Sequence, residues 1–368
     1  MAKRSIDYPL LIVTMILVMF GILMVFSASY YYAENSSNTQ NDALFYFWKQ
    51  ISGAAIGLVA MIACMLFDYN KLKKLRFVIL GIGLLLMLLV FVPGIGIERN
   101  GSRRWVNLIV LDLQSIEVLK FAIIVFMAAG ISINQEKMRQ FKYGMLPYLV
   151  LLLIAAGLLA LQPNFSAVVT LALVMFVMML VGGANLTHFG IMGAIGIAGG
   201  AVMMIAEPYR MSRIFAFLDP WKYSDKESYQ LVQSLYSIGS GGFFGLGLGN
   251  SRQKYLYLPY MESDCIFAII VEELGFFGGI LLLAVFGILI WRGVRIALRA
   301  PNMFGTMLAT GITALIAIQV TINVGVVTGL VPPTGVVLPF ISAGRTSLII
   351  FMACVGVLLN ISKQSHTA

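Results

Sequence analysis

Two acidic residues, Asp264 and Glu262, lie directly before a long apolar run and could supply a general base. They occur in the stretch Y-L-P-Y-M-E-S-D-C-I-F, where a helix is expected to enter the membrane. A carboxylate at a helix N-terminus often only caps the helix. At a membrane boundary, a partly dry site also raises the pKa of a carboxyl towards that of a useful base. Asp264 is therefore the first candidate for the base, and Glu262 is its nearest competitor.

Basic residues gather in the segments expected on the same side of the membrane. They are Arg103 and Arg104 beside Trp105, then Arg210, Arg213, Lys222, Arg252, Lys254 and Arg345. Any one of them is explained by ordinary solvation of a loop. As a set, they predict a site for an anionic ligand, because guanidinium and ammonium groups suit phosphate oxygens. We expect Arg210, Arg213 and Lys254 to contribute more than Lys222, which has acidic neighbours.

Four ionisable residues interrupt apolar runs. Glu117 and Lys120 are three residues apart, so they share one helical face and can pair. Glu272 and Glu273 are adjacent in C-I-F-A-I-I-V-E-E-L-G-F. Charge at membrane depth is expensive and by default marks a functional interior. A structural ion pair explains Glu117 and Lys120 equally well, and a structural role is the better explanation for the two glutamates.

The composition indicates what kind of scaffold positions these residues. Of 368 residues, 60% are hydrophobic and 11% are charged, whereas a soluble domain has about 25% charged residues. A soluble enzyme or a nucleic-acid-binding module is excluded, because that much apolar surface cannot be hidden from water. Three dispersed cysteines and two histidines form neither a disulfide framework nor a zinc ligand set. The chain is predicted to be a polytopic membrane protein.

The expected fold class is all-α, with about ten transmembrane helices in a single domain over residues 1–368. A spanning helix needs about 20 apolar residues. The runs of that kind are approximately 9–28, 50–67, 77–97, 116–133, 145–161, 165–182, 189–206, 265–291, 303–326 and 345–361. With a cytoplasmic N-terminus, thirteen of the 25 basic residues fall in the inner segments. This positive-inside pattern predicts that both termini are cytoplasmic.

The outer loop at 207–264, between the seventh and eighth spans, is too long for a simple connection and is expected to have its own structure. The stretch 228–238 predicts a helix with an apolar stripe of Leu231, Val232, Leu235 and Tyr236, whereas Gln230, Gln233 and Ser237 lie off the stripe. Six glycines follow between positions 239 and 249. Such a density permits tight turns and close approach to a ligand.

Several stretches together resemble the shape, elongation, division and sporulation (SEDS) family. They are N-G-S-R-R-W (100–105), Q-S-I-E-V-L-K (114–120), F-L-D-P-W (217–221), I-G-S-G-G-F-F-G-L-G-L-G-N-S-R-Q-K-Y-L-Y-L-P (238–259), S-D-C-I-F-A-I-I-V-E-E-L-G-F (263–276) and L-P-F-I-S (338–342). The stretch 247–254 is more similar to the FtsW/SpoVE branch than to the RodA branch. Three stretches depart from the family pattern and indicate a divergent member, at Asn164 in place of the usual aspartate, at 262–265, and at Arg345 within 342–347.

The resemblance implies a peptidoglycan glycosyltransferase that polymerises lipid II at the outer face of the bacterial cytoplasmic membrane, in division or sporulation. It places Asp264 at the catalytic position and implies a divalent cation, Mg²⁺ or Mn²⁺, without an organic cofactor. Its expected partners are lipid II, a class B penicillin-binding transpeptidase and other divisome or sporulation proteins, but no nucleic acid. The metal ligands are not predicted. We expect substrate contacts from Arg103, Lys120, Arg210, Arg213, Gln233, Arg252 and Lys254, with supporting roles for Glu117, Trp105, Glu262 and Ser342.

Two other functions stay open on the sequence. The chain could be a flippase that carries lipid II across the bilayer, for which Glu117 and Lys120 would be suitable. It could also be a non-catalytic scaffold for the transpeptidase, which the departures from the family pattern allow. A single enlarged loop on one face and the lack of an inverted-repeat pattern favour the polymerase.

Overall fold

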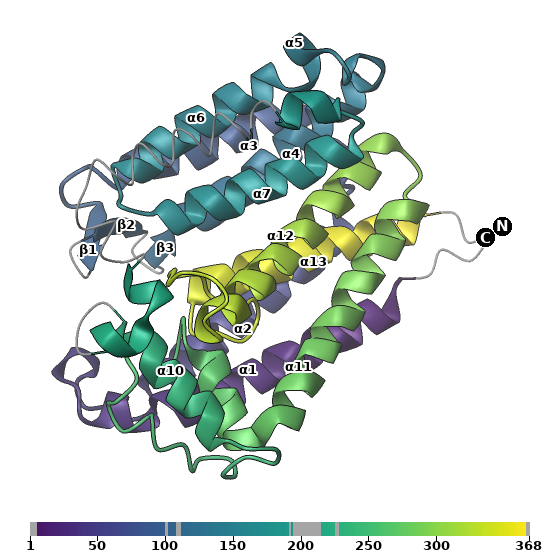
Figure 1. Ribbon diagram of the computed structural model, residues 1–368. Coiled ribbons are helices and arrows are strands. Elements are labelled where there is room, and N and C mark those ends of the chain that lie inside the picture. The colour runs from purple at the N-terminus through teal and green to yellow at the C-terminus, as the bar shows by residue number, and fades with distance from the viewer. Residues whose placement is uncertain are drawn as a thin grey trace.

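The computed structural model describes residues 6–99, 102–107, 112–190, 193, 215–224 and 228–365. Figure 1 shows long helices in three neighbouring groups, with α3, α4, α6 and α7 on one side, α2, α12 and α13 in the centre, and α1, α10 and α11 on the other side. The helices are α1 (Tyr8–Glu34), α2 (Phe45–Leu66), α3 (Asn70–Leu89), α4 (Ser115–Ile133), α5 (Phe141–Gly144), α6 (Leu146–Ala160), α7 (Phe165–Val181), α10 (Tyr229–Ser240), α11 (Ile266–Arg299), α12 (Met303–Val327) and α13 (Arg345–Gln364).

The described helices confirm the class of polytopic helical membrane protein. Seven candidate spans are long and apolar enough to cross a membrane, one of them being α5 and α6 taken together (Phe141–Ala160), and α7 is a shorter apolar helix. The third predicted span is displaced: 77–97 was expected, whereas α3 covers Asn70–Leu89. The helix ends there because the sequence V-P-G-I-G follows, and proline and glycine stop a helix. Most of the seventh predicted span, 189–206, lies outside the described residues.

A small antiparallel sheet, which an all-α prediction does not include, lies at one end of the helices. Its strands are β1 (Gly96–Arg99), β2 (Ser102–Asn107) and β3 (Asp112–Gln114), with β2 in the middle. The Thr346 hydroxyl donates to the carbonyl of Asp112 at 2.9 Å and accepts from the amide of Gln114 at 3.2 Å. These bonds fix the sheet to the first turn of α13.

The turns expected on the inner side meet at the opposite end of the bundle. The Tyr69 amide donates to the Asn360 side chain at 3.1 Å, and the Asn302 side chain donates to Asn70 at 3.0 Å. These contacts join the α2–α3 turn, the α11–α12 turn and the end of α13. In Figure 1, α1 begins and α13 ends at this end, away from α10 and the sheet. The bundle therefore has two distinct faces, as the alternation of loop types predicts.

Close backbone packing places α13 in the centre of the bundle. A Cβ added at Gly356 on α13 would lie 2.3 Å from the Met61 carbonyl oxygen of α2, so only glycine allows this approach. The buried side chains of Phe351, Met352 and Val355 fill the space around it. Small residues permit such packing where lipid supplies no hydrophobic driving force between helices. The rigid centre supports the segments that carry the candidate site.

Candidate active site

Asp264 lies in a short turn that two other parts of the chain hold by their polar atoms. The turn is closed by the amides of Ser263 and Cys265, which both donate to the Tyr260 carbonyl. From α12, the Asn323 side chain donates to the Asp264 carbonyl at 2.8 Å. From the segment before α13, the Ser342 hydroxyl donates to the Ser263 carbonyl at 2.6 Å, which agrees with the supporting role predicted for Ser342. The backbone that carries the carboxylate is therefore fixed from several sides.

The Asp264 carboxyl is partly exposed, and its charged neighbours are Glu262 and Arg104. Burial raises the pKa of Asp264 from its usual value near 3.8 to about 7, the negative charge of Glu262 contributes in the same direction, and the Arg104 guanidinium opposes them. Burial also raises the pKa of Glu262. A carboxyl with a pKa near 7 exchanges its proton readily at neutral pH, as a general base must.

Arg104 reaches this site from β2, where alternate side chains point to opposite faces. Its guanidinium donates to the carbonyls of Gln162 at 3.2 Å and Pro163 at 2.5 Å. Arg103, its neighbour in the strand, is exposed and pairs with Glu98 at 3.1 Å. The sequence places both arginines among the basic residues of the outer segments and predicts Arg103 as the contact to substrate. The sequence does not predict this strand, and the strand places Arg104, not Arg103, towards Asp264.

The three-residue stretch 162–164 supports Arg104 rather than adding a carboxylate. Its two carbonyls accept from the guanidinium, and the Gln162 side chain donates to the Met87 carbonyl at 3.2 Å. Asn164 caps α7 by accepting from the Ala167 amide. An amide oxygen caps a helix as well as a carboxylate does. The departure from the family pattern at Asn164 therefore leaves the local structure intact.

The predicted loop helix is present as α10 and packs against the start of α11. Its Gln230 side chain donates to the Cys265 thiol at 3.0 Å, next to Asp264. Gln233, the glutamine predicted to contact substrate, is half-buried on the same helix. Tyr236, in the predicted apolar stripe, is 52% exposed. Ser237, predicted to lie off the stripe, is buried because it faces a carboxylate on α11.

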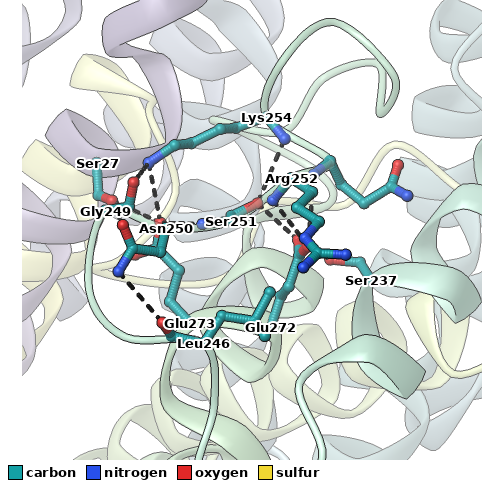
Figure 2. A network of polar contacts seen from close by, with 11 residues as sticks. Ser27, Ser237, Leu246, Gly249, Asn250, Ser251, Arg252, Lys254, Glu272 and Glu273 are labelled. Carbon is teal, nitrogen blue, oxygen red and sulfur yellow. Dashed lines mark hydrogen bonds and ion pairs between the residues drawn. The ribbon is translucent and has the colours of Figure 1, made fainter.

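That carboxylate is Glu272, which binds the glycine-rich segment (residues 239–254) to α11 (Figure 2). It is fully buried. It accepts from the hydroxyls of Ser237 at 2.8 Å and Ser251 at 2.6 Å, and from the amide of Arg252 at 2.9 Å. Hydrogen bonds to an ionised group are the strong ones, and several of them together replace the lost water. Glu272 thus has the structural role that the sequence favours.

Glu273 points to the other side of α11, towards α1 (Figure 2). The Ser27 hydroxyl of α1 lies 2.8 Å from both of its carboxylate oxygens, and the Lys254 ammonium lies 3.2 Å from one of them. Lys254 is 6% exposed and also donates to the Gly249 carbonyl. Its charge is already neutralised inside the protein. The geometry therefore favours a structural role for Lys254 over the predicted contact with substrate.

The glycines approach the backbone of α11 rather than an empty binding surface. Gly275 breaks α11 with a φ of +74°, and a Cβ there would lie 2.4 Å from the Gly245 amide nitrogen. Across the break, the amides of Leu246 and Gly247 donate to the carbonyls of Glu272 and Glu273 at 3.0 Å each. The loop thus satisfies backbone groups that the interrupted helix leaves without partners. The sequence suggests close approach to a ligand, whereas in the structure these glycines approach the backbone of α11.

The other predicted residues lie in different settings. The Arg252 side chain is exposed on the loop surface, so it is available to a ligand. Trp105 lies in the central strand β2, beside Arg104. Glu117 and Lys120 form the expected pair on α4, with the ammonium 2.7 Å from one carboxylate oxygen and both side chains buried. Arg210 and Arg213 lie outside the described residues.

Metal ligation has few donors near the site. In the ranges that the structure describes, no group of three or more histidine, cysteine or acidic side chains could hold a metal ion. Glu262 and Asp264 still provide two neighbouring carboxylates. Mg²⁺ is commonly held by one or two carboxylates together with water and substrate phosphates. The pair fits a weakly held divalent cation whose other ligands come from the substrate.

Comparison with known proteins decides the family. The family model described as "Cell cycle protein", for FtsW, RodA and SpoVE, matches residues 8–367. The chain belongs to this family. Among its relatives, stage V sporulation protein E of Bacillus subtilis is 42% identical over 99% of both chains. A probable peptidoglycan glycosyltransferase FtsW of Trichlorobacter lovleyi is 40% identical over 97% of this chain and 93% of its own.

Solved structures of relatives have the same fold. A chain from a peptidoglycan synthase complex that coordinates polymerization and crosslinking aligns with a TM-score of 0.80 at 25% identity, over 98% of both chains. The rod shape determining protein RodA of Thermus thermophilus aligns with a TM-score of 0.71 at 26% identity, over 99% of both. The matches to SpoVE and FtsW confirm the branch that the sequence indicates.

Proposed function

We propose that this SEDS protein is a peptidoglycan glycosyltransferase that polymerises lipid II at the outer face of the cytoplasmic membrane. The observation that supports it most is the Asp264 carboxyl, whose pKa of about 7 and fixed backbone suit a general base. Its relatives include proteins named as probable peptidoglycan glycosyltransferases. Their identity to this chain extends over nearly its whole length, including the segment that carries Asp264.

The chemistry requires one base and several cations. In this mechanism the acceptor sugar hydroxyl gives its proton to Asp264 while its oxygen forms a bond to the anomeric carbon of the donor. The bond from that carbon to the pyrophosphate oxygen breaks, and the undecaprenyl pyrophosphate leaves with the electron pair. Arginine suits this leaving group, because its planar guanidinium binds phosphate oxygens in pairs. Arg104 beside Asp264 and the exposed Arg252 are the described candidates.

The predicted divalent cation is included in the proposal. Glu262, beside the base Asp264, would hold Mg²⁺ or Mn²⁺ together with the substrate phosphates. A cation bound there would neutralise the charge that develops on the pyrophosphate.

The proposed setting follows from the two faces of the bundle. The chain is a multi-pass membrane protein, and we place both termini in the cytoplasm, so that the sheet, α10 and Asp264 lie outside. A related chain occurs in a peptidoglycan synthase complex that coordinates polymerization and crosslinking. We infer that a class B penicillin-binding transpeptidase is the partner here, with other divisome or sporulation proteins around the pair.

The decisive experiment uses the purified protein with labelled lipid II and Mg²⁺ or Mn²⁺. We expect glycan strands from the wild type, and loss of about 10²–10⁴-fold from Asp264→Asn, which is nearly isosteric but cannot accept the proton. Glu262→Gln removes a proposed cation ligand but leaves the base, so it should lose less activity than Asp264→Asn. Near-wild-type activity in Asp264→Asn together with an inactive Glu262→Gln would reassign the base to Glu262. Transfer of lipid II across vesicles without polymer would instead show a flippase, and neither activity would show a scaffold.

A further inference from the structure

Asn323 connects the turn that carries Asp264 to a second outer segment. It lies near the outer end of α12 and is 1% exposed. Its amide nitrogen donates to the Asp264 carbonyl at 2.8 Å and to the Val336 carbonyl at 2.7 Å. Because both partners are acceptors, only the nitrogen of this amide can make the two bonds. One buried side chain thus uses both of its donors to hold two separate loops together.

The second segment reaches the carboxylate itself. Val336 is buried against Ile322 and Val326 of α12, so the backbone beside it has little freedom. Its neighbour Gly335 comes so close to Asp264 that an added Cβ would lie 3.2 Å from a carboxylate oxygen. Gly335 itself is exposed. The backbone at Gly335 therefore borders the open space in front of the carboxylate.

We propose that Asn323 is a positioning residue, which holds Gly335 against the Asp264 carboxylate and so fixes how much space and water the reacting groups have. The proposal rests on the proposed function, since the hydroxyl that reacts must enter the space that Gly335 borders. Asn323 itself does not touch the reacting atoms. It acts through the two carbonyls that it holds.

Two substitutions on opposite sides of this contact test the proposal. Asn323→Ala should release the segment from the carboxylate. The turnover number should then fall about 10–100-fold, as expected when a reacting group is misplaced by about 1 Å, while the KM for lipid II stays near the wild-type value because Asn323 does not touch the substrate. Gly335→Ala adds a methyl group to the space that the acceptor hydroxyl must enter, so it should raise the KM and lower the turnover number.

A matched control separates positioning from general destabilisation. Gln319 is a second buried amide one turn earlier on α12. Gln319→Ala should lower the melting temperature about as much as Asn323→Ala but leave the turnover number unchanged. Wild-type turnover in Asn323→Ala, or an equal loss of turnover in Gln319→Ala, would overturn the proposal. If Asn323→Ala does not fold, wild-type turnover and KM in Gly335→Ala would overturn it in the same way.

A second readout needs no lipid II. Hydrogen–deuterium exchange measured by mass spectrometry reports how firmly the segment around Gly335 and Val336 is held. Exchange there should be faster in Asn323→Ala than in the wild type and unchanged in Gln319→Ala. Faster exchange in Asn323→Ala, together with a wild type that makes no polymer, would keep the positioning role and reject the glycosyltransferase. Equal exchange in the wild type and Asn323→Ala would reject the positioning role whatever the activity.

Discussion

At the scale of single residues, the site depends on a carboxylate that is costly to bury. Asp264 keeps a pKa of about 7 because burial and Glu262 act on it together, while Arg104 only partly compensates. Unpaired buried charge opposes folding, and enzymes accept that cost where the chemistry requires it. The ionised Asp264 carboxylate should therefore lower the stability of the folded protein.

The first prediction concerns stability and pH. The folded Asp264 carboxyl binds its proton more tightly than the unfolded one, with a pKa of about 7 against about 3.8. Stability present below pH 4 is therefore lost progressively as the pH rises to about 7. Asp264→Asn cannot ionise, so it should melt higher than the wild type at pH 8 and equally near pH 4. Differential scanning fluorimetry in detergent measures this, and equal melting at pH 8 would contradict it.

The second prediction concerns the neighbouring arginines. Arg104 lowers the pKa of Asp264, so Arg104→Gln should move the acidic limb of the pH–rate profile to higher pH. It should also weaken lipid II binding, seen as a higher KM. Arg103→Gln is the control, because Arg103 is exposed and pairs with Glu98. Identical profiles for the two variants would mean that Arg104 has no special relation to Asp264.

At the scale of elements, α11 and the glycine-rich segment behave as one unit. The segment closes the break at Gly275 by backbone hydrogen bonds, and Glu272 and Glu273 hold it from inside. It then leads directly to the turn of Asp264. The two buried glutamates thus serve the site by fixing the path of the chain that enters it.

The third prediction tests this unit. Lys254→Met leaves Glu273 buried without its cation, and removing one partner of a buried pair costs about 3–5 kcal/mol. The melting temperature should fall clearly, and Lys254→Met combined with Glu273→Gln should recover part of the loss. Arg252→Gln, an exposed neighbour, should melt as the wild type. A Lys254→Met protein of normal stability but raised KM would return Lys254 to the substrate site.

The sequence allows some of these elements to be predicted better than others. The lengths of the apolar runs predict the long helices. The position of Asp264 directly before one of these runs predicts the place of the candidate active site. The choice between Arg103 and Arg104 depends on the strand β2, which a short polar stretch does not reveal. The sequence analysis selects Gln233, whereas in the structure Gln230 contacts Cys265 beside Asp264. The pattern of the helix does not reveal this contact, because the two residues are 35 positions apart. Asn323 was missed, although Gln319 and Asn323 put two amides on one face of an apolar helix.

At the scale of the whole molecule, the bundle separates the face that carries Asp264 from the face that contains both chain ends. The α1–α2 connection lies on the same face as the sheet, since Asp42, Asp112 and Arg345 line one cavity of about 450 Å³. The opposite face contains the start of α1 and the end of α13, where the Asp7 amide donates to Ser362. The proposed topology, with polymerisation outside the membrane, requires such a separation.

The fourth prediction tests that topology. Single cysteines at exposed Asn38 and at Ser365, in a chain without its native cysteines, report the two faces. An impermeant maleimide should label Asn38→Cys in intact cells and Ser365→Cys only after lysis. A membrane-permeant maleimide serves as the control for expression. Labelling of Ser365→Cys in intact cells would invert the proposed orientation.

The buried glutamates of α11 also impose an order on biogenesis. An acidic residue at the centre of a helix adds about 2.5–3.5 kcal/mol to the free energy of membrane insertion. The donors that compensate Glu272 and Glu273 all precede them in the chain, at Ser27, Ser237 and 251–254. They have therefore already left the ribosome when α11 reaches the insertion machinery. In the proposed orientation the loop crosses the membrane first, so α11 can leave the translocon directly onto its hydrogen-bonding partners.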